Sequence, residues 1–333
     1  MTAFLQEVAR VMLAEHGKDL REVTVVLPSQ RAGLYLRKWL AEEAGAPLWG
    51  PEIFTVGTFM ERLSGLRSLP PEELLLEAYE AYREVEKEKA RPIGEFLQWA
   101  PTSLADISEA DAYLVPLEGF YRDLRSWEEL DWSFNDTPLS FGQESMVRFW
   151  AMIGKMHAAL NARLLTQGTG TTGLIERTAA SAQVGEGLWK TVWFAGLNAL
   201  TPSQERVIAQ FKELGIARLA WDADTYYLND PLQEAGGHLR KAIARFGPGV
   251  LPARNGLASG RLGMRIIRAP NEVAQAWSVA ELLRDTSQAE RANTAVVLAD
   301  ESLLQPLLEA LPENLGPLNI TMGLPIALLP VGS

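Results

Sequence analysis

The sequence predicts an α/β protein built on a parallel sheet, and three observations support this fold class. Short apolar strand patterns alternate with amphipathic helical patterns near both ends of the 333-residue chain. A long, mostly helical stretch separates the two alternating regions. Hydrophobic residues make up 47% and charged residues 22% of the chain, a balance that allows a buried core.

The first alternating region starts with a helical face over residues 5–13 and a buried strand over 23–27. A helix over 30–43, a strand over 53–56 and a helix from about Thr58 follow. This order of strand, helix, strand and helix is typical of a parallel sheet with crossover helices.

Long helical patterns then dominate residues 64–184, and few β-branched runs interrupt them. We interpret this stretch as a helical insertion. A strand at 191–195 resumes the α/β pattern. A helix over 202–214 follows, with Thr201 as its expected N-cap and Pro202 at its first position.

A basic stretch follows the next expected strand, at 216–221. No Asp or Glu occurs from residue 235 to residue 268, and the positive residues there are Arg240, Lys241, Arg245, Arg254, Arg261, Arg265 and Arg268. The formal net charge of the whole chain is -11, which argues against a protein that coats DNA by overall charge. The stretch is open to two interpretations: one place that binds nucleic acid, or a solvated linker that offsets acidic neighbours.

The last part of the chain predicts the start of a second α/β domain. Short strands are expected at 264–268, 294–298 and 318–321, with helices over 271–285 and 301–310 between them. The predicted organisation is therefore an α/β domain over 1–63 and 185–234, a helical insertion over 64–184, a basic linker over 235–262 and a partial second α/β domain over 263–333.

The sequence lacks the motifs of a complete catalytic site. There are no cysteines, which excludes a disulfide, a thiolate metal ligand and a cysteine nucleophile within these residues. Neither Gly17-Lys18 nor Gly154-Lys155 is followed by Ser or Thr, so the Walker A phosphate-binding loop is inactive. The strand at 191–195 also ends without the acidic residues that would hold Mg²⁺. We expect no cofactor in this segment and no ATP hydrolysis by it.

Histidines and aspartates are the remaining candidates for catalysis. The three histidines lack metal-ligand spacing and are interpreted as surface or packing residues: His16, His157 and His238. Asp222 and Asp224, with Asp230 close behind, form the best carboxylate group, but no lysine motif of a metal-dependent nuclease lies nearby. We interpret these aspartates as N-cap or loop residues, so no catalytic residue and no metal ligand is predicted.

The sequence also predicts where the protein resides. The N-terminal stretch is amphipathic and is broken by Arg10 and Glu15, unlike a signal sequence. No apolar run approaches the roughly 18 residues that a membrane span requires. We expect a soluble, cytoplasmic protein with no membrane partner.

Several strings, taken in their order and spacing, resemble a known family. They include VTVVLPSQ at 23–30, PEIFTVGTFMERLSGL at 51–66, WFAGLNALTPSQE at 193–205, WDADTYYLNDPLQEAGGHLR at 221–240 and NITMGLPIALLP at 319–330. The family is that of bacterial PD-(D/E)XK nuclease proteins similar to the B subunit of AddAB-type helicase–nucleases. The resemblance covers nearly the whole chain.

The resemblance implies a superfamily 1 helicase-like sheet domain whose motor is inactivated, in agreement with the missing phosphate-binding loop. It also implies a Mg²⁺-dependent exonuclease domain far downstream, so nuclease activity is not assigned to these residues. In such a fold the loops after the strands follow single-stranded DNA, and the residues that occupy them here are Ser29, Gln30, Arg31, Thr55, Thr58, Thr321 and Met322. From the basic stretch we add Arg240 and Lys241 as candidate DNA contacts.

The expected function is that of a non-catalytic module that binds or scans single-stranded or end-exposed DNA. It would serve an exonuclease of DNA repair or recombination, beside a helicase partner subunit. Two alternatives stay open: a docking or structural segment of a helicase–nuclease complex, and a divergent ATP-dependent motor. The candidate contacts also have a structural interpretation, since Ser29 and Thr58 are good N-caps and Arg31 fits a solvated helix.

Overall fold

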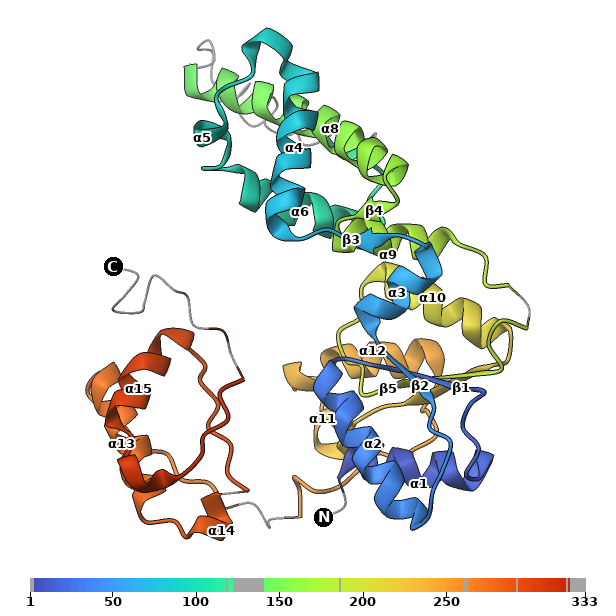
Figure 1. Cartoon of the computed structure of the whole chain (residues 1–333), viewed down its shortest axis with the longest axis vertical. Coiled ribbons are helices and arrows are strands. Elements are labelled where there is room, and N and C mark those ends of the chain that lie inside the picture. Colours follow the sequence, from blue (N-terminus) through green and yellow to red (C-terminus); the bar gives the residue numbers. More distant parts are fainter. Residues whose placement is uncertain are drawn as a thin grey trace. The chain divides into compact units, whose positions relative to one another are not determined.

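The computed structural model describes residues 3–117, 119–121, 141–185, 187–259, 263–291, 293–321 and 323, the side chains of 141–145 and 147 excepted. Contacts divide the chain into two compact units, residues 1–261 and residues 262–333. Each unit is described separately, and both are drawn in Figure 1.

The first unit contains a four-stranded parallel sheet in the order β2-β1-β5-β6. Its strands are β1 (Val23–Leu27), β2 (Glu52–Thr55), β5 (Thr191–Ala195) and β6 (Ala217–Ala220). All five residues of β1 are buried, as a central strand covered on both faces requires. The predicted α/β class with a parallel sheet is therefore confirmed for this unit.

Helices cover both faces of this sheet (Figure 1). On one face, α1 (Phe4–His16) and α2 (Gln30–Ala44) bury their apolar sides against β1 and β5. On the other face lie α3 (Val56–Ser64), α10 (Pro202–Glu213) and α12 (Gly237–Phe246), in a core that includes Phe59, Phe194 and Phe211. Alternate residues of each central strand point to opposite faces, so Val25 and Val26 belong to different cores.

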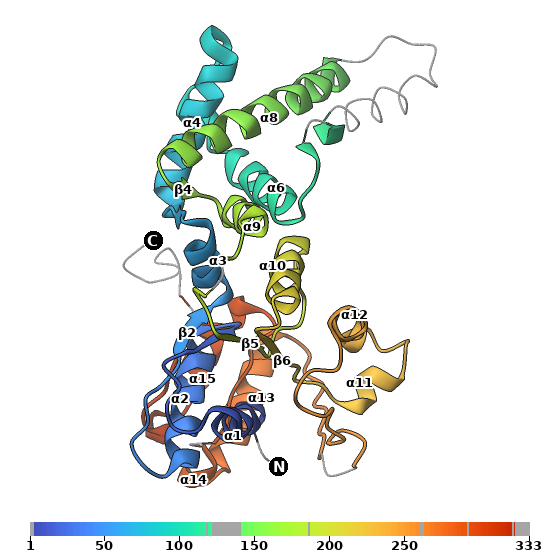
Figure 2. The same ribbon diagram turned by 90° about the vertical axis from the view of Figure 1, so that its right-hand side faces the viewer.

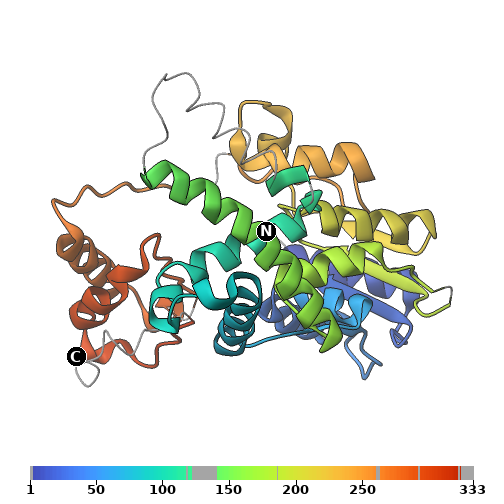
Figure 3. The same cartoon turned by 90° about the horizontal axis from the view of Figure 1, so that it is seen from above.

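A helical lobe extends the first unit between α3 and β5 (Figure 2). Its base is a two-residue parallel pair of strands, β3 (Arg67–Ser68) and β4 (Thr169–Gly170). Its helices are α4 (Pro71–Glu86), the 3-10 helix η1 (Lys87–Lys89), α5 (Ile93–Phe96), α6 (Ala100–Ala112), α8 (Phe141–Thr166) and α9 (Thr172–Ser181). Figure 3 shows α8 as a long green rod across the lobe. The lobe shares one apolar cluster with α3 and α10, so it is continuous with the sheet's core.

The prediction of a basic linker over 235–262 is wrong for the described residues 235–259, which contain a helix and buried side chains. After α11 (Thr225–Asn229) and the 3-10 helix η2 (Glu234–Gly236), the chain forms α12, which buries Leu239, Ala242 and Phe246. The indole nitrogen of Trp221 donates a hydrogen bond to the Gly247 carbonyl at 3.0 Å, which joins the end of α12 to the sheet. The apolar residues of this stretch recur at helical spacing and form a buried helix face, although its many cations and lack of carboxylates had indicated a linker.

The second unit contains α13 (Glu272–Arg284), α14 (Gln288–Arg291), η3 (Glu301–Leu303), α15 (Leu304–Ala310) and η4 (Glu313–Leu315). The three predicted strands do not form among its described residues, so the expected second α/β domain is helical here. Strand formation needs a main-chain partner and cover for apolar side chains. Ile266 and Val297, from two of the predicted strands, have neither and are 86% and 87% exposed.

Within the described residues, no helix is long and apolar enough to span a membrane.

Candidate nucleic-acid interface

Two helices begin at the edge of the sheet where β1 and β2 end. Ser29 is the N-cap of α2, and its hydroxyl accepts a hydrogen bond from the Ala32 amide at 3.2 Å. Thr55 is the N-cap of α3 and accepts from the Thr58 amide at 3.2 Å. The Thr58 hydroxyl accepts in return from the Thr55 amide at 3.0 Å, which completes a capping box. Carboxyl edges of parallel sheets are where ligands of this fold class bind.

A cavity of about 280 Å³, which we call the edge cavity, opens between these two helix starts. It brings together four of the nine predicted contact residues, Ser29, Gln30, Thr55 and Thr58. The complete lining is Ser29, Gln30, Gly33, Leu34, Arg37, Ile53, Phe54, Thr55 and Thr58. Polar side chains and the amide ends of two helices therefore surround one open space.

The cation of the edge cavity is Arg37 rather than the predicted Arg31. Residues 30, 33, 34 and 37 share one face of α2 because they follow the i, i+3, i+4, i+7 spacing. Arg31 is exposed and does not line the cavity. Neither arginine forms an ion pair with any described acidic residue. Helical spacing from Gln30 is the signal that could have identified Arg37.

Gly33 lets this face of α2 approach β2 closely. A Cβ atom at Gly33 would stand 3.1 Å from the Cγ2 atom of Ile53, tighter than ordinary van der Waals contact. The small residue thus shapes the wall between α2 and the strand. Any larger side chain would have to push Ile53 aside and narrow the edge cavity.

A second cavity, of about 230 Å³, lies on the other side of Thr55 and Thr58 and is more acidic. Its two carboxylates are already engaged. Glu61 Oε1 accepts from the amide and hydroxyl of Ser68, at 3.0 and 2.6 Å. Glu176 accepts from the Thr201 hydroxyl at 2.6 Å and from the side-chain amide of Gln204 at 2.8 Å. Negative charge makes this side the poorer place for a phosphate.

A third crevice, of about 330 Å³, lies where the strand order reverses, between β1 and β5. Phe4, Tyr35 and Trp39 contribute aromatic walls, and Asp222 contributes a carboxylate. Burial raises the pKa of Asp222, and the guanidinium of Arg254, 3.9 Å away, opposes the shift. Such a crevice suits a flat apolar group better than a phosphate.

The other two aspartates of the predicted carboxylate group serve local structure, as their sequence context predicted. Asp224 is the N-cap of α11 and accepts from the amides of Tyr226 and Gly256 at 2.9 and 2.7 Å. Burial favours a higher pKa for Asp224, but these amide hydrogen bonds outweigh it and lower the pKa. Asp230 accepts from the Leu232 amide at 2.9 Å in a turn. The described residues contain no group of three or more possible metal ligands.

The turn after β1 has no room for a phosphate-binding loop. Only Pro28 and Ser29 separate the end of β1 from the start of α2. A nucleotide loop at this position needs several glycine-rich residues and a lysine to surround the phosphates. The edge therefore offers two capped helix ends but no nucleotide cradle at the first turn.

The remaining predicted contacts lie elsewhere. Arg240 is half-buried, and its guanidinium donates hydrogen bonds to four main-chain carbonyls in the preceding turn. Three of these distances are 2.9–3.0 Å, and the four acceptors belong to Tyr227, Asp230, Pro231 and Gln233. Arg240 therefore stabilises this turn and does not face outward. Its neighbour Lys241 is exposed. In the second unit, Thr321 is exposed and outside any helix or strand, and Met322 lies outside the described residues.

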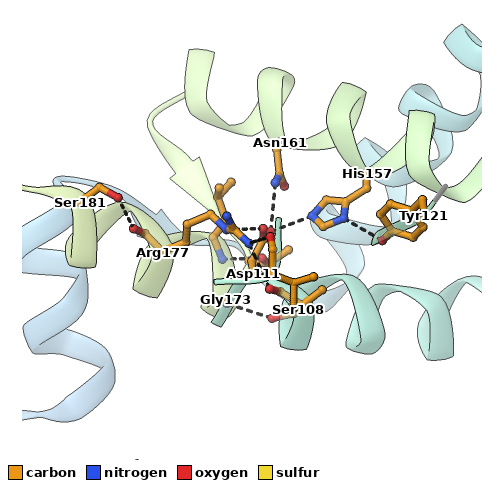
Figure 4. Close-up of polar contacts among 12 residues, drawn as sticks. Ser108, Asp111, Tyr121, His157, Asn161, Gly173, Arg177 and Ser181 are labelled. Atoms are coloured by element: carbon orange, nitrogen blue, oxygen red, sulfur yellow. Dashed lines mark hydrogen bonds and ion pairs between the residues drawn. The ribbon is translucent and has the colours of Figure 1, made fainter. Parts of the chain in front are cut away.

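A separate polar cluster lies inside the helical lobe (Figure 4). We call it the Asp111 cluster: Asp111 of α6, His157 and Asn161 of α8, Arg177 of α9, and Tyr121. Asp111 Oδ2 lies 2.9 Å from His157 Nε2 and 3.0 Å from Asn161 Nδ2, and Asp111 Oδ1 lies 2.8 Å from Arg177 Nε. On its other side, His157 Nδ1 is 2.9 Å from the Tyr121 hydroxyl. The side chains of Asp111 and His157 are fully buried.

The Asp111 cluster joins α6, α8 and α9, and its chemistry is structural. Arg177 also donates to the carbonyls of Ala110 and Val115 at 3.1 and 2.7 Å, so it binds the end of α6. Tyr121 borders an apolar cavity of about 430 Å³, and burial, followed by the charge of Asp111, raises its pKa to about 12. A phenol with that pKa stays protonated at neutral pH and acts as a hydrogen-bond donor. His157, interpreted from sequence as a surface or packing residue, is thus a buried member of this network.

Comparison with known proteins adds no relative, since no protein-family model and no curated protein sequence matches the chain.

Proposed function

We propose that this chain is a non-catalytic, helicase-like module that binds single-stranded or end-exposed DNA at the carboxyl edge of its sheet. The observation that carries the proposal is the edge cavity, where Ser29, Gln30, Thr55 and Thr58 meet Arg37. Amide groups at helix N-termini carry partial positive charge and favour phosphate oxygens. A guanidinium beside them adds a full charge and paired donors.

Charge supports local rather than extended contact with DNA. The chain carries a net charge of -11, so most of its surface repels a phosphate backbone. Arg37 has no acidic partner among the residues that the structure describes, and its charge is therefore available to a ligand. Hydroxyls, amides and one arginine bind the phosphate backbone of DNA and do not distinguish one base from another. We expect binding that is independent of base sequence and sensitive to salt.

The proposal assigns the chemistry of cutting to another domain. The two-residue turn after β1 is too short to surround the phosphates of a nucleotide. The described carboxylates at this edge either accept internal hydrogen bonds or are not grouped with other carboxylates that could hold a metal ion. The resemblance to helicase–nuclease B subunits supplies the context: an exonuclease of DNA repair or recombination, with Mg²⁺ at its nuclease domain and a helicase subunit as partner.

Two arginines on the same helix give a direct test. We expect Arg37→Ala to weaken binding of a fluorescein-labelled oligothymidine roughly fivefold at about 0.1 M salt, as the loss of one phosphate contact predicts. The slope of log affinity against log salt should fall by about 0.7. Arg31→Ala removes the same charge one residue from Gln30 but outside the cavity, and should leave affinity near wild type. Fluorescence anisotropy measures both, and a flat wild-type titration at low salt would overturn the proposal.

A second candidate function, a docking segment of a helicase–nuclease complex, is favoured by one observation. In residues 262–333 several apolar side chains are exposed, among them Met264, Ile266, Trp277 and Val297. A partner protein that covered such side chains would remove apolar surface from water, which stabilises association. A folded protein that ignores DNA but binds the helicase subunit in sedimentation experiments would favour docking over the DNA-binding proposal.

A further inference from the structure

A wide groove lies on the helical lobe, apart from the edge cavity. It has a volume of about 930 Å³ and runs between the end of α4, η1, α5 and the first half of α8. Figure 2 shows α4 and α8 against each other at this end of the unit. Its lining combines aromatic residues with cations, and we call it the basic groove.

The floor of the basic groove is aromatic. Trp99 packs its ring against Tyr82 at 5.6 Å, Phe96 at 4.9 Å and Phe149 at 5.3 Å between ring centroids. Tyr82, Trp99 and Phe149 line the groove itself, and Trp99 and Phe149 are only partly buried. Ring faces and edges of this kind stack on nucleobases of any sequence.

The rim carries a net positive charge, because its lining has four cations against two carboxylates, Glu86 and Glu95. Arg148 and Lys155 are seven residues apart on α8, which places them on one face, about 10 Å apart along the helix axis. Lys89 adds a third cation from η1. All three are exposed, and none forms an ion pair with a described acidic residue. A fourth cation, Arg91, is paired with Glu95 at 3.2 Å.

Hydrogen bonds fix the turn that carries Lys89. Lys87, at the start of this turn, has a φ angle of 52°, a backbone conformation that non-glycine residues rarely adopt. The turn is fixed by two tyrosines of α4. The Arg91 amide donates to the Tyr82 hydroxyl at 3.1 Å, and the Tyr79 hydroxyl donates to the Arg91 carbonyl at 3.2 Å. Backbone strain of this kind is a reason to examine the site for function.

We infer that the basic groove is a second binding site for single-stranded nucleic acid, with phosphates on Arg148, Lys155 and Lys89 and bases on the aromatic floor. The inference rests on one part of the proposed function, that the chain binds single-stranded DNA, and it adds the basic groove as a second place where the same strand binds. Unpaired cations in a chain of net charge -11 point to a polyanion. The aromatic floor favours a nucleic acid over an acidic peptide, because it gives stacking surface to bases.

The test removes the two cations of α8 together. In the full chain, Arg148→Ala/Lys155→Ala should weaken oligothymidine binding roughly 25-fold at about 0.1 M salt and lower the salt slope by about 1.4, the values for two lost phosphate contacts. The matched control is Lys18→Ala/Arg206→Ala, which also removes one lysine and one arginine that are exposed and have no acidic partner in the described part of the chain. Both pairs should keep the wild-type thermal transition, since none of the four side chains makes an internal bond there.

The outcomes separate this inference from the proposed function. If Arg37→Ala weakens binding and the α8 pair does not, the edge cavity is supported as a binding site and the basic groove is refuted. If the α8 pair alone weakens binding, the basic groove is supported as a binding site and the edge cavity is refuted. If a polyglutamate peptide of about 20 residues displaces the oligonucleotide from wild type but not from the α8 pair, the groove selects acidic chains and the inference is overturned. A control pair that loses as much affinity as the α8 pair would also overturn it.

Discussion

The first unit holds two polar clusters that differ in almost every physical respect. At the sheet edge, the hydroxyls of Ser29, Thr55 and Thr58 form hydrogen bonds, among the described residues, only with groups three positions away, and these residues lie at the surface. In the lobe, Asp111 is fully buried, and its partners His157 and Asn161 are 46 and 50 residues away in sequence. Local, exposed hydrogen bonds leave a site open to a ligand. Long-range, buried ones hold helices together.

The largest effect that this comparison predicts is on stability, in the lobe. Asp111→Asn should lower the free energy of unfolding by about 3 kcal/mol, because it leaves Arg177 without its counter-charge in a desolvated place. Urea unfolding followed by circular dichroism measures the change. Asp106→Asn is the control, since Asp106 lies on the same helix but is exposed, and it should change stability by less than about 0.5 kcal/mol. Equal effects of the two variants would contradict a structural role for the cluster.

A smaller effect is expected at the sheet edge. Thr55→Val keeps the shape of the side chain but removes the acceptor of the Thr58 amide, so stability should fall by about 1 kcal/mol. Thr172→Val provides the control, because this exposed threonine opens α9 and its hydroxyl makes no hydrogen bond within the described part of the chain. The same thermal or urea transition tests both. A loss at Thr55 as large as that at Asp111 would mean that the edge is a structural element and not an open site.

The same contrast explains how much of the molecule the sequence could predict. Val23–Leu27 is a continuous apolar run, and Thr201 with Pro202 is a helix start, so both appeared where local pattern placed them. Local physical chemistry was sufficient for these elements. The start of α3 was predicted wrongly, because Thr58 was taken as the N-cap, whereas Thr55 is the N-cap and Thr58 is the third helical residue of its capping box.

Residues that depend on distant partners could not be predicted. Helical spacing from Gln30 gives the face of α2 that carries Arg37, but only the packing of β2 beside α2 makes that face the wall of a cavity. His157 gained its partners from α6 and Tyr121, far away along the chain. The β-branched run around Ile266 predicted a strand, but a strand also needs a neighbour, and the described residues supply none. A single sequence shows the periodicity of helices and strands, but it does not show which distant residues come into contact.

The effect with the smallest consequence at neutral pH concerns the ionisation of Tyr121. Its pKa is raised to about 12, mainly by burial and then by the nearby carboxylates of Asp111 and Asp106. A phenol is charged when deprotonated, so the folded state favours the protonated form more than the unfolded state does, whose pKa is about 10. The stabilisation is therefore complete below about pH 10 and is lost as the pH rises through about 12.

Two measurements test this. Ultraviolet titration of the folded protein should show a late tyrosine step near pH 12, and Tyr121→Phe should abolish that late step. The same variant should lose less stability than wild type between about pH 10 and 12, because its ring has no proton to release. A late step that survives in Tyr121→Phe would place the raised pKa on another tyrosine and would show that water reaches the Tyr121 hydroxyl. In that case the Asp111 cluster would be solvated at this end, and the contrast with the sheet edge would hold only for Asp111 and His157.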